Sequence, residues 1–437
     1  MYNLPLSQEL VRNEVKNFGI KDLSKATIRE IVGIVNNLSN ITGIKYMRME
    51  MGVPGLNPPE IGVNAEIDAL KKGVVSKYPM VDGVKELKQE ASRFIKLFMG
   101  IDVSPESCIA TVGSMQGAYA TFMMCSNLDP KRDTALFIDP GFPVQKQQFK
   151  VLGYKFDSFD VYNYRGEALR EKLESMLIKG NINSIIYSNP NNPSWICLTD
   201  EELQIIGELA NKYDVIVIED LAYFGMDFRR DLYHPGQPPY QVSVANYTEN
   251  YVLLISGSKA FTYAGQRIGI VAISDKIYHR SYPNLLTRFG SDKFGYTFVQ
   301  RLIYALSSGV SHSAQYGLAA MLKAANDGKF NFIKEVKEYG ERARIMKKLF
   351  TDAGFYIVYD KDLEEDLADG FYFTIAFPGM DGNQIIEELL RYGISAISLG
   401  NTGSEKSEGL RACVSQIKLD MMPELEKRLK LWKENHK

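Results

Sequence analysis

The chain has 437 residues, with 51 basic and 53 acidic side chains and a formal net charge of -2. This balance excludes the strongly basic surface that nucleic acids or anionic membranes attract. Apolar residues make up 45% of the chain, yet no run of about 18 apolar residues occurs, and the first 17 residues lack a signal-peptide core. We therefore expect a cytoplasmic globular protein that is large enough for one large and one smaller domain.

Four cysteines are widely spaced and include no Cys-x-x-Cys pair: Cys108, Cys125, Cys197 and Cys413. This spacing is typical of reduced, mostly buried thiols in a cytosolic protein. No metal site is predicted.

The middle of the chain alternates strand and helix patterns. Short apolar runs predict strands over 134–139, 184–188, 215–218, 251–255 and 268–273. Residues 199–213 predict a helix, because Thr199 and Glu202 have capping-box spacing and apolar residues share one face. Strands that alternate with helices favour an α/β fold with a mostly parallel sheet.

The pattern changes after about residue 315. Residues 314–350 predict helix with a break near Asp327 and Gly328, followed by strands over 355–359 and 370–377 and a helix over 382–392. We expect three parts: an N-terminal segment (1–55) that packs with the small domain, a large domain (56–315), and a small α+β domain (316–437).

Three polar residues follow predicted strands: Asn192, Asp220 and Lys259. Ligands of open α/β sheets gather at the carboxyl ends of the strands, so we expect these side chains to lie close together.

Lys259 carries the most chemical information of the three. It lies among small and hydroxyl residues, including Ser256, which leaves room for a bulky covalent adduct on its amino group. Arg267, eight residues later, supplies a forked cation suited to a phosphate. Together these residues predict a lysine that forms an imine with a phosphate-bearing aldehyde cofactor.

Three motifs carry a family resemblance over roughly residues 52–411: Ser-Gly-Ser-Lys before Gly-Gln-Arg-Ile-Gly, Asp-Leu-Ala-Tyr at Asp220, and Asn-Pro-Asn-Asn-Pro-Ser at 189–194. The chain resembles the class I/II aminotransferases of fold type I, which depend on pyridoxal 5'-phosphate. The resemblance implies a large cofactor-binding domain with a mostly parallel sheet flanked by helices, and a smaller α+β domain.

The resemblance also implies roles around the cofactor ring. Lys259 would bind the cofactor and transfer the proton, while Asp220 would face the pyridine nitrogen and keep it protonated. Tyr223 and Asn192 would bond the phenolic oxygen, and Phe142 would stack on the ring.

Further roles concern the phosphate and the substrate. Ser114, Met115, Ser256 and Arg267 would hold the phosphate, and Tyr78 would reach the phosphate of a neighbouring subunit, which implies a homodimer. Arg411 would grip the substrate α-carboxylate, with Gly52 and Asn192 beside it.

One position departs from the family pattern. Ser194 and Trp195 stand where Thr-Gly is usual, and a tryptophan does not readily adopt the positive φ of a glycine. We therefore expect a different local turn.

Other functions share these motifs. The same fold hosts C–S lyases, cyclising synthases and decarboxylases. No histidine lies between Asp220 and Tyr233, which argues against the acyl-transferring branch. A cofactor-sensing DNA regulator would need more sequence before Gly52.

The amino acid that serves as substrate stays open. Arg288 or Lys293 would suit a dicarboxylate, whereas the nearby aromatic residues Phe289, Phe294, Tyr296 and Phe298 would suit an apolar side chain.

Overall fold

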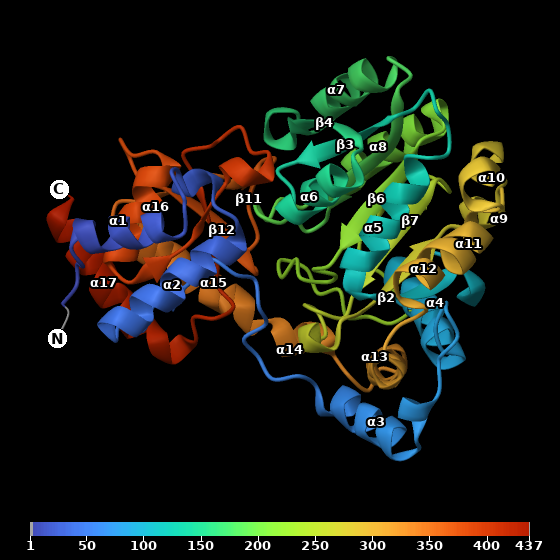
Figure 1. Cartoon of the computed structure of the whole chain (residues 1–437), viewed down its shortest axis with the longest axis horizontal. Helices are drawn as coiled ribbons and strands as arrows, with labels where there is room; N and C mark the ends of the chain where they lie inside the picture. The colour runs from blue at the N-terminus through green and yellow to red at the C-terminus, as the bar shows by residue number, and fades with distance from the viewer. Residues whose placement is uncertain (1–2, 437) are drawn as a thin grey trace.

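A seven-stranded sheet forms the centre of the larger of two lobes in the computed structural model, which describes residues 3–436 (Figure 1). Only β8 runs antiparallel to its neighbours, so the prediction of a mostly parallel sheet is confirmed. The strands are, in spatial order, β2 (Cys108–Val112), β8 (Ile268–Ile273), β7 (Tyr251–Ser256), β6 (Ile216–Leu221), β5 (Ile182–Ser188), β3 (Thr134–Asp139) and β4 (Lys155–Asp160).

Every residue of β3, β5, β6, β7 and β8 is buried, because helices cover both faces of the sheet. Successive residues of β7 therefore enter different cores. Leu253 and Ile255 pack into the core between the lobes, while Val252 and Leu254 pack into the core on the opposite face. Continuous apolar runs, rather than alternating ones, are the sequence signature of such strands.

The helices of the larger lobe surround this sheet. The capping box predicted for α8 is present: the Thr199 hydroxyl accepts from the Glu202 amide, and the Glu202 carboxylate accepts from the Thr199 amide. The helices are α3 (Glu60–Lys71), α4 (Lys85–Met99), α5 (Gly113–Cys125), α6 (Pro143–Leu152), α7 (Glu167–Leu177), α8 (Asp200–Tyr213), α9 (Asp275–His279), α10 (Pro283–Phe289), α11 (Phe294–Thr297), α12 (Tyr304–Ser307) and α13 (His312–Asn326).

The smaller lobe contains a four-stranded antiparallel sheet in the order β14-β15-β12-β9. Its strands are β9 (Tyr356–Ile357), β12 (Tyr372–Ala376), β14 (Ile397–Ser398) and β15 (Leu410–Cys413), with a hairpin of β10 (Lys361–Asp362) and β11 (Glu365–Asp366) alongside. Its C-terminal helices are α15 (Glu338–Asp352), α16 (Gly382–Arg391) and α17 (Met422–Asn435), while α14 (Phe332–Val336) packs against the larger lobe, with the Phe332 ring centre 5.1 Å from that of Phe261.

The N-terminal segment contacts the smaller lobe. Strand β1 (Met47–Arg48) pairs in parallel with β13 (Ile394–Ser395). Helices α1 (Gln8–Asn17) and α2 (Ile28–Thr42), blue in Figure 1, lie beside α16 and α17 in orange and red. Helix α13 instead packs against α3 and α4 of the larger lobe. The domain limits at residues 55 and 315 stay a prediction.

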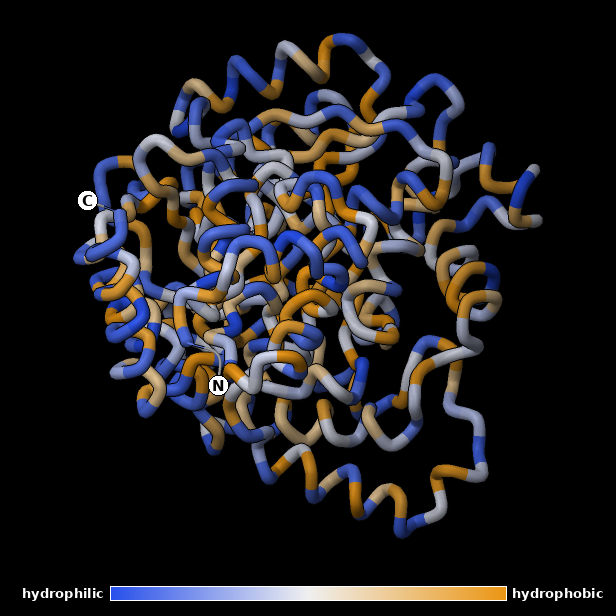
Figure 2. Tube along the Cα trace, turned by 60° about the vertical axis from the view of Figure 1, so that its left-hand side comes forward, coloured by the Kyte–Doolittle hydropathy of each residue, from blue (hydrophilic) through white to orange (hydrophobic). Residues whose placement is uncertain are grey.

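Figure 2 shows hydrophobic residues concentrated in the interior, while the outer helices alternate between hydrophobic and hydrophilic positions. None of the helices in residues 3–436 is both long and apolar enough to span a membrane.

Asp362 joins the lobes through two buried ion pairs. Its carboxylate lies 2.7 Å from Arg165 and 3.0 Å from Arg229, both in the larger lobe. Arg165 also pairs with Glu202, at 2.7 Å. One carboxylate on the β10–β11 hairpin thus pairs with two arginines of the larger lobe, and Arg229 pairs in addition with Asp227 at 2.9 Å.

Replacement of Asp362 by asparagine should lower the free energy of unfolding by about 1–3 kcal/mol, because Arg165, Arg229 and the Cys197 amide lose a charged hydrogen-bond acceptor while Glu202 and Asp227 still pair with the arginines. Chemical denaturation followed by fluorescence measures this. The matched control is Asp366→Asn on the same hairpin, whose exposed pair with Lys361 should contribute little to stability. Equal effects of the two substitutions would show that Asp362 has no special part in holding the lobes together.

Candidate active site

Lys259 lies in the loop that follows β7, where the two lobes meet. Its amino group donates a hydrogen bond to the backbone carbonyl of Gly52 and lies 5.3 Å from the centre of the Phe371 ring. Burial lowers the pKa of this amine to about 8, and the cations of Arg411 and Arg267 act in the same direction. A substantial neutral fraction therefore exists near physiological pH, as a nucleophilic amine requires.

Asp220 is the penultimate residue of β6, the strand next to β7. The sequence places it just past the strand, but its backbone pairs with Leu254, so the strand extends beyond the apolar run. The carboxylate accepts from the Ala222 amide (3.1 Å) and from the Gln145 side chain (2.8 Å). Burial nevertheless raises the pKa of Asp220 to about 6, so a cation beside it would favour its charged form.

Arg411 crosses from the smaller lobe to the larger one. It lies in β15, is 1% exposed, and donates to the Asn192 side chain (3.2 Å) and to the Glu50 carbonyl (2.6 Å). Its Nε has no partner, and no carboxylate pairs with it within residues 3–436. A buried guanidinium without an acidic partner is a suitable site for a carboxylate from outside the chain.

The start of α5 offers unused backbone donors. No side chain caps this helix and its first turn has no acidic residue, so the amides near Ser114 and Met115 face an anion-binding position. The exposed guanidinium of Arg267 lies so close that a Cβ on Gly113 would come within 2.6 Å of it.

Ser256 lies at the edge of the anion-binding position at the start of α5. It pairs with Gly269 across the sheet, and a Cβ on Gly269 would come within 2.9 Å of the Ser114 nitrogen. The Ser256 hydroxyl accepts from the Ser258 amide at 3.1 Å, which fixes its orientation. Hydroxyl, helix terminus and arginine together suit a phosphate.

Phe142 immediately precedes α6, three residues before Gln145. One helical turn therefore brings the half-buried Phe142 to the same end of α6 as the side chain that holds Asp220. Gln145 was not identified as a site residue from the sequence, although its spacing from Phe142 was a usable signal.

Gly52 lies against Tyr372: a Cβ at this position would come within 2.1 Å of the tyrosine hydroxyl oxygen. Only a glycine fits here. Tyr372 and Phe371 were not identified as site residues from the sequence, because β12 reads as an ordinary buried strand.

Three residues that the sequence offers as site residues lie away from the residues described above. Tyr78 is 93% exposed. Arg288 bonds Asn127 (2.8 Å), which follows the C-terminal end of α5, opposite the end that carries Ser114. Lys293 precedes α11 and bridges to Ser281. Within residues 3–436, neither Arg288 nor Lys293 makes a side-chain hydrogen bond to a residue of this group.

The expectation of a different turn at Trp195 is wrong. Trp195 adopts a φ of 67°, the conformation that a glycine would favour. The indole is 1% exposed and packs edge-on against Tyr223, with ring centres 5.3 Å apart. Burial of so large a ring outweighs the roughly 1–2 kcal/mol that a left-handed conformation costs a non-glycine residue.

These features fit pyridoxal phosphate. The start of α5 with Arg267 suits the phosphate, Asp220 suits a ring nitrogen that carries a proton, and the enclosed amine of Lys259 suits the aldehyde. Tyr223 and Asn192 lie nearby, and Tyr223 bonds Tyr372 at 2.8 Å.

Solved structures share the fold. An alanine aminotransferase from Pyrococcus furiosus matches with a TM-score of 0.75 at 19% identity, covering 94% of this chain and 98% of its own. An aspartate aminotransferase from Thermotoga maritima matches with a TM-score of 0.75 at 18% identity, covering 96% and 99%.

Relatives in sequence point the same way. A probable aspartate aminotransferase from Methanocaldococcus jannaschii is 24% identical over 350 residues, which cover 76% of this chain and 88% of the relative. An aspartate aminotransferase from Bacillus subtilis is 25% identical over 403 residues, covering 88% and 90%. The family model "Aminotransferase class I and II" matches residues 44–429, so the chain belongs to this family of aminotransferases, which use pyridoxal phosphate.

Proposed function

We propose that this aminotransferase moves an amino group between an L-amino acid and a 2-oxo acid by a ping-pong mechanism, with Lys259 as the residue that binds the cofactor and transfers the proton. The observation that carries the proposal is the position of Lys259 between two buried groups, one suited to the cofactor ring and one suited to the substrate carboxylate. Asp220 lies on the sheet behind it, and Arg411 faces it from the smaller lobe without an acidic partner.

When bound, the cofactor withdraws the negative charge that remains on the substrate carbon after its proton leaves. Asp220 supports this by holding a positive charge at the ring nitrogen, and Gln145 with the Ala222 amide fixes the direction of its carboxylate. Phe142 provides a flat apolar surface for the ring.

The phosphate binds at the start of α5. The amides near Ser114 and Met115, the Ser256 hydroxyl and the Arg267 guanidinium form the proposed anion site. The Gln148 side chain donates to the Met115 carbonyl at 2.9 Å and so supports this turn. The phosphate would anchor the cofactor while its other end reacts.

Lys259 acts twice in this proposal. Its neutral amine would hold the cofactor through the aldehyde, with loss of water, and after the substrate amine has replaced it Lys259 would accept the proton of the substrate α-carbon and give it back. Tyr223 and Asn192 would donate to the phenolic oxygen beside it. A pKa near 8 suits an amine that both accepts and returns a proton near neutral pH.

Arg411 binds the substrate α-carboxylate, supported by the side-chain oxygen of Asn192. Gly52 lies beside this position, and its missing side chain leaves room for the Tyr372 hydroxyl. These contacts would orient the α-hydrogen toward Lys259.

The active unit in this proposal is a homodimer. Exposed apolar side chains gather on α3, on the segment after it, and near α11 and α12, around a hollow of about 400 Å³ lined by residues 74–79 and 307–313. Tyr78 projects from this surface, in position to reach a second subunit. The residues are Ile61, Ile67, Leu70, Val75, Tyr78, Met80, Tyr296, Tyr304 and Leu306.

Replacement of Lys259 by alanine should reduce turnover by at least the roughly 10²–10⁴-fold that acid–base catalysis contributes. Steady-state transamination measures this, with the exposed Lys276→Ala as a control of unchanged activity. In the wild-type apoprotein, the rate of covalent cofactor attachment should rise with pH and level off above about 8, as the amine loses its proton. Wild-type turnover by the alanine variant would refute the assignment.

Replacement of Asp220 by asparagine should stabilise the apoprotein at high pH. The folded-state pKa of about 6 lies above the usual 3.8, so the stability that protonation contributes at low pH is lost as the pH rises through 6. The asparagine variant does not lose this stability, and the difference in the free energy of unfolding corresponds to about 3 kcal/mol. Thermal unfolding of both apoproteins should show a gain near pH 8 that shrinks near pH 5.

The exposed Asp157→Asn is the control for this experiment, and it should behave like the wild type at both pH values. Bound cofactor should stabilise Asp220→Asn less than the wild type, because the variant cannot hold the ring charge. A variant that is equally destabilised at both pH values would contradict the prediction.

Hybrid dimers test Tyr78. Lys259→Ala and Tyr78→Ala should each be impaired alone, but a hybrid dimer has one site with both residues intact if Tyr78 acts across the interface. Equal random mixing should then give about one quarter of the wild-type activity. Native mass spectrometry verifies that hybrids form. Hybrids without recovered activity would place the role of Tyr78 within its own subunit.

A further inference from the structure

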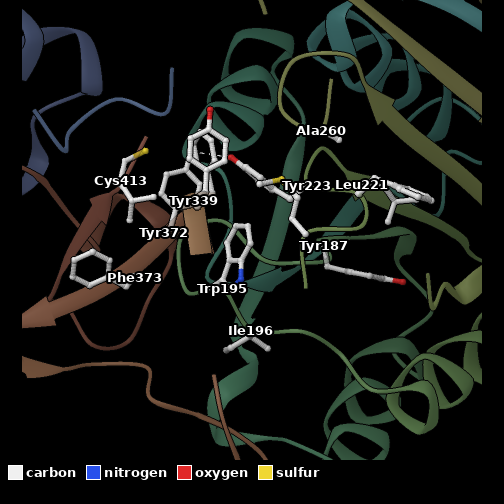
Figure 3. Close-up of a cluster of buried hydrophobic side chains, with 14 of the residues drawn as sticks. Tyr187, Trp195, Ile196, Leu221, Tyr223, Ala260, Tyr339, Tyr372, Phe373 and Cys413 are labelled. Atoms are coloured by element: carbon white, nitrogen blue, oxygen red, sulfur yellow. Dashed lines mark hydrogen bonds between the residues drawn. The ribbon is translucent and has the colours of Figure 1, made fainter. Parts of the chain in front are cut away.

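Tyr372 contacts residues from both sides of the proposed site. Its hydroxyl lies 2.8 Å from that of Tyr223, and its ring lies 4.6 Å from the guanidinium carbon of Arg411. Figure 3 shows Tyr223, Tyr372 and Trp195 gathered in one cluster, with Tyr223 from the larger lobe and Tyr372 from β12 of the smaller one. No motif used above includes Tyr372.

We propose that Tyr372 is a positioning residue: its hydroxyl sets the strength of the hydrogen bond that Tyr223 makes to the cofactor, and its ring holds Arg411 in place. This inference rests on the function proposed above, in particular on the contact of Tyr223 with the phenolic oxygen.

The two hydroxyls share a limited number of protons. Each tyrosine hydroxyl has one hydrogen to donate and lone pairs to accept with. In the structure Tyr223 donates to Tyr372. If Tyr223 directs its hydrogen to the cofactor, the bond between the two hydroxyls survives only when Tyr372 becomes the donor. Cofactor binding would thus reverse the direction of this hydrogen bond.

The surroundings favour this reversal. Burial raises the pKa of both phenols, so both keep their protons. At Tyr372 the nearby cation of Arg411 works against the rise in pKa, which makes its hydroxyl a good donor. A hydroxyl that accepts a hydrogen bond donates its own more strongly, so Tyr372 would strengthen the contact between Tyr223 and the phenolic oxygen.

Trp195 packs against both Tyr223 and Tyr372. Its indole meets both phenol rings edge-on, with centres 5.3 Å from Tyr223 and 6.2 Å from Tyr372. A Cβ on Gly370 would come within 2.0 Å of the indole, so this glycine makes the arrangement possible. Trp195, which stands where a glycine is usual in the family, therefore packs directly against the two tyrosines.

The ring of Tyr372 has a separate effect. It lies against the Arg411 guanidinium from the neighbouring strand, since β12 and β15 pair with Tyr372 opposite Cys413. A cation over an aromatic face is attracted to the negative face of the ring. The ring would therefore restrict the guanidinium while its donors face the substrate.

Two substitutions separate the hydroxyl from the ring. Tyr372→Phe should raise the apparent pKa at which the absorbance of the bound cofactor titrates, by a few tenths of a pH unit, because the phenolate form loses part of its stabilisation. It should leave the dissociation constant for propanoate, an unreactive carboxylate, within twofold of the wild type. Tyr372→Leu should in addition weaken propanoate binding about fivefold.

A double-mutant cycle distinguishes positioning from a general structural effect. Tyr223→Phe should shift the titration further than Tyr372→Phe, and the double variant should match Tyr223→Phe alone, because Tyr372 acts through Tyr223. Tyr339→Phe, in the same aromatic cluster, is the matched control and should titrate like the wild type. Circular dichroism and cofactor stoichiometry verify that each variant is folded and loaded.

The possible outcomes differ clearly. An unchanged titration in Tyr372→Phe, or an additive shift in the double variant, would overturn the role of the Tyr372 hydroxyl. An unchanged titration in Tyr223→Phe would instead overturn the role of Tyr223 in the proposed function. If Tyr372→Phe loses the cofactor altogether, propanoate binding to the apoproteins of the Phe and Leu variants, by calorimetry, decides the role of the ring.

Discussion

Burial of charge where the lobes meet is the constraint on which the site depends. Asp220 and Arg411 are buried there and Lys259 is half-buried, and within residues 3–436 none of them has an oppositely charged side-chain partner. An uncompensated buried charge costs several kcal/mol, so such groups persist only when the fold forces them together. The parallel sheet holds Asp220 and leads to Lys259, while the antiparallel sheet holds Arg411. Ligands that carry the complementary charges would relieve this cost.

The linker between the N-terminal segment and α3 takes part in the same arrangement. Its backbone supplies the Glu50 carbonyl to Arg411 and the Gly52 carbonyl to Lys259. Both oxygens come from a chain section that crosses between the lobes, blue in Figure 1. The site therefore draws on both lobes and on the section that joins them, and relative movement of the lobes would change several contacts at once.

Local sequence pattern was sufficient to predict the fold and to nominate most of the proposed site residues. The apolar runs of β3 and β7 and the capping box of α8 are short-range features, and so are the motifs around Lys259 and Asp220. The contacts of Tyr372 and of the Glu50 and Gly52 carbonyls could not be predicted, because they join residues 149 to 361 positions apart in the chain. At Trp195 local reasoning gave the wrong answer, since tertiary packing overcame the backbone preference. The roles of individual residues and the domain limits remain predictions.

The fit between Trp195 and Gly370 limits how this sequence can change. A side chain at 370 would occupy the space of the indole, so tryptophan at 195 requires glycine at 370. A glycine at 195 would leave a void beside Tyr223 that only a repacked neighbourhood could fill. The two positions are therefore epistatic: an ancestral chain had to contain the glycine at 370 before, or together with, the tryptophan. A glycine at 195 would therefore require a matching change at or near position 370, in the segment that precedes β12.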